Sequence, residues 1–219
     1  MNIVLPIAGC FYTESLIFEI NAIFAALFHI PLQLAAHVAL ANTSTFFYFI
    51  AVGVNVTCTT YIGISAGKNQ PIAAVKYAKI GIGIMVLILI IEEFFFFIFR
   101  DAWSKAFGHD SELQSELLFL HTIYMILLVP DSLQNPFMGI LKPLNKGGSA
   151  LKSYGVIYYL FGLPFTYFLA FKLELWTVGL WIGFLVSVFI NDLSLVYIMV
   201  RTDWKKEIED IFDRENQNS

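Results

Sequence analysis

Charged residues are scarce in this chain of 219 residues: Asp, Glu, Lys and Arg make up 14%, whereas 58% of the residues are hydrophobic. A soluble domain with these proportions would expose more apolar surface than soluble monomers usually do. The mean hydropathy of +0.72 points the same way. The composition therefore argues against a soluble globular protein and indicates a chain that lies in a lipid bilayer.

Cysteine is almost absent, with Cys10 and Cys58 as the only two. Both fall in apolar stretches, and neither has the neighbours or the spacing of a metal-ligand motif. We therefore expect no disulfide framework, no metal site and no bound cofactor. The two residues are interpreted as small apolar side chains.

Long hydrophobic runs dominate the sequence, and a helical span needs about 20 mostly apolar residues. The runs exceed the roughly 10 residues of a membrane strand and show no strict alternation, so helices are expected. We predict an all-α membrane protein with one six-helix bundle over residues 1–201, followed by a polar cytosolic tail over 202–219. The expected helices are 7–29, 33–62, 71–99, 116–141, 151–173 and 177–200.

The first run begins close to Met1, yet it carries Glu14 and Glu19 and lacks a basic leading region, so we interpret it as a true span. Lys and Arg residues divide ten to three between the two sides of the predicted bundle, and the positive-inside rule places the ten in the cytosol with both termini. The expected location is multi-pass, in the plasma membrane or in vacuolar or other endomembranes. The ten are Lys68, Lys76, Lys79, Lys142, Lys146, Lys152, Arg201, Lys205, Lys206 and Arg214.

Three carboxylates, Glu14, Glu19 and Asp131, interrupt these apolar runs. An ionised side chain at the bilayer centre costs roughly 2.5 kcal/mol or more, so each is a candidate functional residue. Gln134 and Asn135 follow Asp131 at i+3 and i+4 and form one polar stripe with it on the expected helix. Such a stripe suits a proton or Na⁺ site, and the alternative is a structural hydrogen-bond network between helices.

Two prolines, Pro130 and Pro136, bracket this stripe. They should kink the helix and free backbone carbonyls that could coordinate a cation. On the first helix, Glu14 and Glu19 lie about 140° apart and cannot share one face.

A G-x-S-x-G match around Ser65 invites comparison with intramembrane serine proteases. The nucleophile elbow requires a strand–turn–helix context, which is missing from this helical stretch. The residues are better explained as a close-packing segment of small side chains that leads into a loop. We therefore expect no enzyme, and the protease is kept only as a remote alternative.

Several segments resemble MATE (multidrug and toxic compound extrusion) transporters of the eukaryotic branch. Glu14 and Glu19 keep the spacing of that family's Glu-Trp-Trp-x-x-Glu pattern, which lies in the first helix of its second six-helix lobe. The order of the similar segments covers nearly the whole chain. The other similar segments are 41–43, 53–63, 67–70, 131–183 and 202–207.

This resemblance implies a secondary active antiporter that expels organic cations, xenobiotics or metabolites in exchange for H⁺ or Na⁺. It places Glu14 and Asp131 on the family's cation or substrate carboxylates and Glu19 on a supporting acidic position. Asn42 falls on a polar position that lines the same cavity. The expected partners are the lipid bilayer and a small organic substrate, with no nucleic acid.

The chain departs from the family in length, because the family has twelve spans in two lobes and only the second is matched. One lobe cannot form both walls of an alternating-access cleft. We therefore expect a partial transporter, interpreted as a fragment, that needs a missing N-terminal lobe or a second chain. The alternative is a non-transporting membrane subunit or regulator with the same fold, which would not need the carboxylates.

Overall fold

The computed structural model describes the backbone of residues 4–218, with the side chains of 4–8, 10, 11, 14, 215, 216 and 218 outside the description. Within these bounds every regular element is helical, so the predicted all-α class is confirmed. The elements are α1 (Val4–Leu27), α2 (Pro31–Gly67), α3 (Pro71–Ile98), α4 (Arg100–Ala106), α5 (Ser111–Leu141), α6 (Gly147–Tyr154), η1 (Gly155–Gly162), α7 (Leu163–Tyr167), η2 (Phe168–Lys172), α8 (Trp176–Arg201) and α9 (Trp204–Asn218).

Among the described residues, five stretches are long and apolar enough to cross a membrane, and a shorter apolar helix covers Ser15–Leu27, within α1. The structure therefore has the membrane-type helices that the hydrophobic runs indicate. The five are α2, α3, α5, the continuous stretch Gly147–Lys172 and α8.

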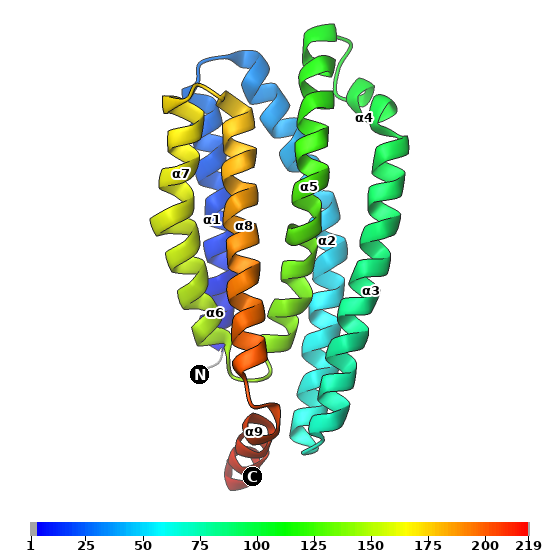
Figure 1. Ribbon diagram of the computed structural model, residues 1–219, viewed down its shortest axis with the longest axis vertical. Helices are drawn as coiled ribbons and strands as arrows, with labels where there is room; N and C mark the ends of the chain where they lie inside the picture. Colours follow the sequence, from blue (N-terminus) through cyan, green and yellow to red (C-terminus); the bar gives the residue numbers. More distant parts are fainter. Residues whose placement is uncertain (1–3, 219) are drawn as a thin grey trace.

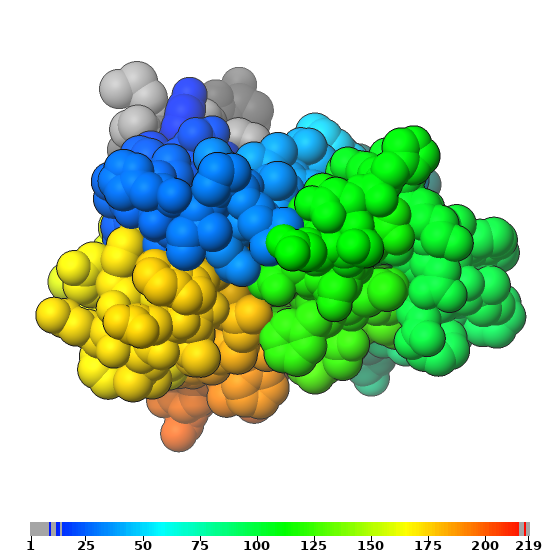
Figure 2. Space-filling model, turned by 90° about the horizontal axis from the view of Figure 1, so that it is seen from above, coloured from blue at the N-terminus to red at the C-terminus, as the bar shows by residue number. Residues whose placement is uncertain are grey.

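The helices form two groups around α5 (Figure 1). On one side α1 packs with α6 and α8, and on the other α2 and α3 pack together; α5 contacts both groups, most extensively α2 and α8. The starts of α1 and α9 lie at one end of the bundle, and α4 lies at the other. Figure 2 looks onto the α4 end, where the α1–α2 connection (blue) lies beside the η2–α8 connection (yellow), with α4 and the start of α5 (green) opposite.

The span before α8 is not one regular helix, in contrast to the single helix expected over 151–173. Two π-helical stretches, η1 and η2, flank the short α7, which contains Pro164. π-Helical turns are rare and often accompany functional sites. Periodicity in the sequence does not reveal them, because the stretch remains apolar throughout.

Small residues let α8 approach this span closely, as is typical of membrane helices. A Cβ atom at Gly183 would lie 2.7 Å from Cα of Thr166, and one at Gly179 would lie 2.7 Å from the backbone nitrogen of Ala170. Only glycine fits at these two positions without moving a backbone.

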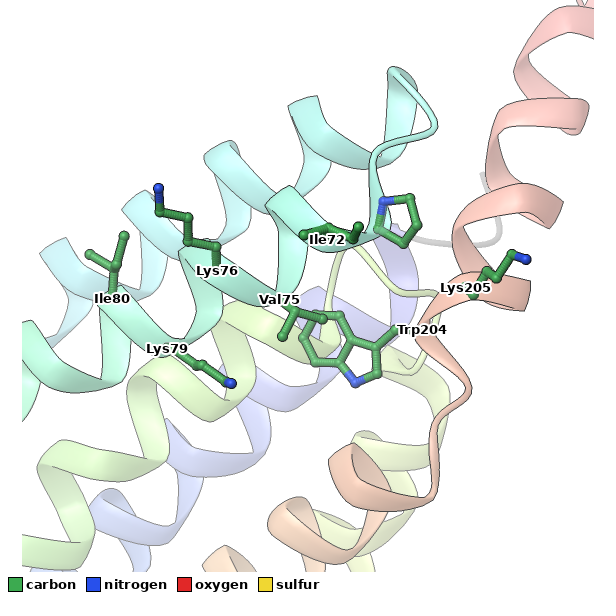
Figure 3. A pocket seen from close by; sticks show the side chains of 8 residues that line it. Ile72, Val75, Lys76, Lys79, Ile80, Trp204 and Lys205 are labelled. Carbon is green, nitrogen blue, oxygen red and sulfur yellow. The ribbon is translucent and has the colours of Figure 1, made fainter.

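The polar tail forms α9, which docks on the bundle. Ile208 is fully buried, and Lys146 in the α5–α6 connection forms an ion pair with Glu207. Figure 3 shows the ring of Trp204 reaching from α9 toward Val75 on α3. Together with neighbouring side chains it lines a groove of about 790 Å³.

Candidate functional site

Asp131 lies inside the bundle on α5, where its residue is 3% exposed. Pro130 and Pro136 are both within α5, which continues through them as one helix. Each proline lacks an N–H, so the carbonyls four residues earlier, at Ile126 and Ser132, lose their helical donors. In Figure 1, α5 changes direction in this half of its length, consistent with the expected kink.

The Asp131 side chain is buried within the bundle. Its Oδ1 atom has no hydrogen-bond partner among the described residues. Tyr124, two turns earlier on α5 and fully buried, is near enough to interact electrostatically with this carboxylate. A buried carboxylate with an open lone pair can accept a proton, a metal ion or a cationic ligand.

Gln134 joins α5 to the π-helical span and to α8. Its Oε1 atom accepts a hydrogen bond from the Tyr158 hydroxyl at 2.8 Å and another from Nδ2 of Asn191 at 2.8 Å. The Ser153 hydroxyl lies 2.9 Å from Oδ1 of Asn191 and extends the network. The amide of Gln134 is therefore fixed by two partners from other helical elements.

Asn135 turns toward α2 instead. Its Nδ2 donates to the backbone carbonyl of Asp131 at 3.4 Å, and its Oδ1 accepts from Nδ2 of Asn55 at 3.5 Å. Lys142 donates from Nζ to Oδ1 of Asn55 at 3.1 Å. The approach is close because a Cβ atom at Gly139 would lie 3.0 Å from Cα of Asn55.

The predicted stripe is thus buried as a unit, but its members make contacts in two directions. Gln134 is 1% exposed and Asn135 is 5% exposed, and each hydrogen-bonds to a different neighbouring helix. The hydrogen bonds of the two amides fit the structural-network alternative, and the site hypothesis stays a prediction. The two amides hold helices together, while Asp131 keeps an oxygen without a partner.

Of the other candidates, Glu19 and Asn42 do not join this cluster in the structure. The side chain of Glu14 lies outside the described residues, although Asn21, which shares its helix face by spacing, is 5% exposed. Glu19 is exposed on α1. Asn42 is exposed on α2 and lines a groove shared with α3, apart from Asp131.

Sequence reasoning missed the partners that fix the amides, namely Asn55, Tyr158 and Asn191. It also assigned no role to Glu92, which proves to be buried on α3 with neither carboxylate oxygen hydrogen-bonded within the described structure. Charged side chains within an apolar run are a signal that could have selected Glu92, which stands beside Glu93, as the same signal selected Asp131.

Ser65 shows no sign of being a nucleophile. It is 3% exposed within α2, and its hydroxyl donates to the Tyr61 carbonyl at 2.8 Å. The helix runs through the whole G-x-S-x-G match, so the strand–turn–helix of a nucleophile elbow does not form. Among the side chains that the structure describes, no group of three His, Cys, Asp or Glu could hold a metal ion.

Comparison with known proteins agrees with a helical membrane lobe. Residues 6–168 match the MatE family model. Protein DETOXIFICATION 35 of Arabidopsis thaliana is 30% identical over 165 residues, which are 74% of this chain and 33% of that protein. Multidrug and toxin extrusion protein 2 of Homo sapiens is 23% identical over 193 residues, which are 88% of this chain and 32% of that protein.

The fold is also that of solved transporters. The crystal structure of the eukaryotic MATE transporter AtDTX14 superposes with a TM-score of 0.89 at 21% identity, over 96% of this chain and 47% of that one. A MATE structure in the bent conformation gives a TM-score of 0.81 at 15% identity, over 89% and 43% of the two chains.

The fold and the family match define one lobe of a two-lobed membrane transporter fold. The chain belongs to the MatE family, and it spans about a third of the length of the curated relatives named above. It is an integral membrane protein of that family.

Proposed function

We propose that this chain is the second lobe of a MATE-type antiporter and that Asp131 supplies a carboxylate at its transport site. The observation that carries the proposal is the buried Asp131 side chain, whose Oδ1 atom has no hydrogen-bond partner among the described residues. Burying a carboxylate without a partner is costly, and such residues in membrane spans commonly bind ions or substrates.

The proposed exchange follows from charge. An organic cation would neutralise ionised Asp131, and H⁺ or Na⁺ binding at the same carboxylate would release it, because one carboxylate cannot fully satisfy two cations. Gln134 and Asn135 would position the segment through their fixed amides, and Glu14 and Glu19 would supply further acidic groups from α1. Asn42 would line the path at a greater distance.

Transport also requires a second wall for the cleft. We infer that the chain acts with a missing N-terminal lobe, as a fragment of a longer protein, or with a second copy. Family membership and the helical bundle support a transporter rather than an enzyme. A non-transporting membrane subunit remains the second candidate, favoured by the way Gln134 ties three helical elements together.

The test is efflux from vesicles containing this chain fused to the first lobe of a full-length relative. A cationic dye should leave in response to an imposed H⁺ or Na⁺ gradient, and Asp131→Asn should reduce the rate by about tenfold or more. The matched control is Asp213→Asn, which alters an exposed carboxylate on α9; it should retain most of the rate because it lies outside the apolar helices. Undiminished efflux by Asp131→Asn would contradict the assignment and favour the regulator.

A further inference from the structure

A second groove lies between α2 and α3, in the half of the bundle that carries α4. Its volume is about 550 Å³, and its walls come from α2, α3, α4 and the residues immediately before and after α4. Nearly all of the lining is apolar and most of it is aromatic. The polar exceptions are Asn42, Thr43 and Glu92.

Glu92 is the charged group of this groove. The residue is 7% exposed, and neither carboxylate oxygen has a hydrogen-bond partner within the described structure. The ion pairs found among the described residues engage Asp101, Glu207 and Glu209, so none of them neutralises Glu92. Burial of an ionised carboxylate is costly, and a cationic partner from outside the described residues would offset that cost at Glu92.

The aromatic rings that line this groove with Glu92 pack against one another in a fixed arrangement. Phe96, one turn after Glu92 on α3, lies 5.3 Å from the Trp103 ring centroid and 5.3 Å from that of Phe47. The Trp103 indole N–H donates to the Thr43 hydroxyl at 2.9 Å, which holds this ring against α2. The faces of such rings attract cations, and cages of this kind recognise organic ammonium groups.

We propose that this groove binds a lipophilic organic cation, held by the Glu92 carboxylate and the rings of Phe96 and Trp103. The apolar walls suit a ligand that reaches the groove from the bilayer, and they offer little to a hydrated inorganic ion. Glu92 lies six residues before the end of α3, about 9 Å along the helix. That depth favours a free cation over the headgroup of a neighbouring lipid.

This site is distinct from the one at Asp131, and binding to it does not require transport. The test is equilibrium binding of tetraphenylphosphonium to the 219-residue chain in nanodiscs of phosphatidylethanolamine and phosphatidylglycerol. Tetraphenylborate, an anion of nearly the same size and shape, should bind much more weakly than the cation. Equal binding of the two ions would overturn the proposal.

Two neighbouring carboxylates provide matched variants. Glu92→Gln should weaken binding of the cation by about tenfold or more, since it removes the charge and keeps the shape. Glu93→Gln should weaken binding much less than Glu92→Gln does, because Glu93 lines a different groove with α5 and α8. An equal loss in both variants, or no loss in Glu92→Gln, would contradict the site.

Further variants separate this inference from the proposed function. Trp103→Leu should weaken binding severalfold without removing a charge, which tests the aromatic contribution if Glu92→Gln folds poorly. Asp131→Asn should leave the binding of the cation to the groove intact, and loss of all binding in that variant would place the cation at Asp131 instead.

The lipid composition tests the remaining occupant. The chain in phosphatidylcholine nanodiscs should bind the cation as well as it does in the first nanodiscs. Markedly weaker binding in phosphatidylcholine would identify a choline headgroup as the occupant of the groove and overturn the proposal.

Discussion

The Tyr158 hydroxyl donates a 2.8 Å hydrogen bond to Oε1 of Gln134 and thereby joins the π-helical span to α5, three residues from Asp131. Both side chains are 1% exposed, so the bond forms away from solvent and lipid headgroups. The Gln134 amide is thus held by hydrogen bonds, while the nearby Asp131 carboxylate keeps an oxygen without a hydrogen-bond partner among the described residues.

Tyr158→Phe should destabilise the bundle because Gln134 loses one of its donors. Hydrogen bonds between membrane helices contribute about 0.6–2 kcal/mol, and a loss in that range is expected. The measurement is unfolding in detergent titrated with sodium dodecyl sulfate. Tyr197→Phe is the control, since Tyr197 is 61% exposed, and it should leave the midpoint unchanged. Equal effects of the two changes would contradict the role of this bond.

Gly183→Ala should push α8 away from α7. The new Cβ atom would lie 2.7 Å from Cα of Thr166, and such overpacking costs about 1–3 kcal/mol. The thermal midpoint in detergent should therefore fall. Gly83→Ala is the control because nothing lies within 4 Å of its Cβ position, so it should be neutral or slightly stabilising. A fall as large for Gly83→Ala would show that the close approach is not the cause.

Glu207→Gln should loosen the attachment of α9 to the α5–α6 connection, since it removes the ion pair with Lys146. Both side chains are partly exposed, so the expected cost is below about 1 kcal/mol. Hydrogen exchange in α9 should become faster, and high salt should reduce the difference. Glu209→Gln, whose pair with Lys205 is longer and more exposed, should exchange like the unmodified chain; faster exchange there would contradict a specific role for Glu207.

The two ends of the bundle should face opposite sides of the membrane. With both native cysteines replaced by alanine and the chain expressed at the plasma membrane, Lys68→Cys should resist an impermeant maleimide added to intact cells, and His109→Cys should react. The physical reason is the ten-to-three division of basic residues, which favours the cytosol for the Lys68 end. The reverse labelling pattern would show that the chain is inserted with the opposite orientation.

The sequence was sufficient to predict the helical class and the burial of Asp131, because apolar runs and an isolated carboxylate are local signals. It could not predict that Gln134 would meet Tyr158 and Asn191 while Asn135 meets Asn55. Those partners come from distant parts of the chain, and helical periodicity gives a residue's face without naming its neighbour. The pairings follow from close approaches such as that at Gly139.

The same limitation explains the positions of Asn42 and Glu92. In the sequence, both are polar residues within apolar runs. The resemblance to MATE transporters implied that Asn42 lines the same cavity as Asp131. The packing of α2 on α3 instead brings Asn42 and Glu92 to one groove. The two π-helical stretches could not be predicted either, since their composition is that of an ordinary apolar helix.

The central claim is that substrate and coupling ion share the Asp131 carboxylate. The most direct measurement is binding of a cationic substrate to the fused two-lobe protein carrying Glu92→Gln, as H⁺ or Na⁺ concentration is raised at constant ionic strength. The account predicts that one of these ions lowers the apparent affinity competitively, and that the competition disappears in Asp131→Asn. Unchanged competition in Asp131→Asn would contradict it.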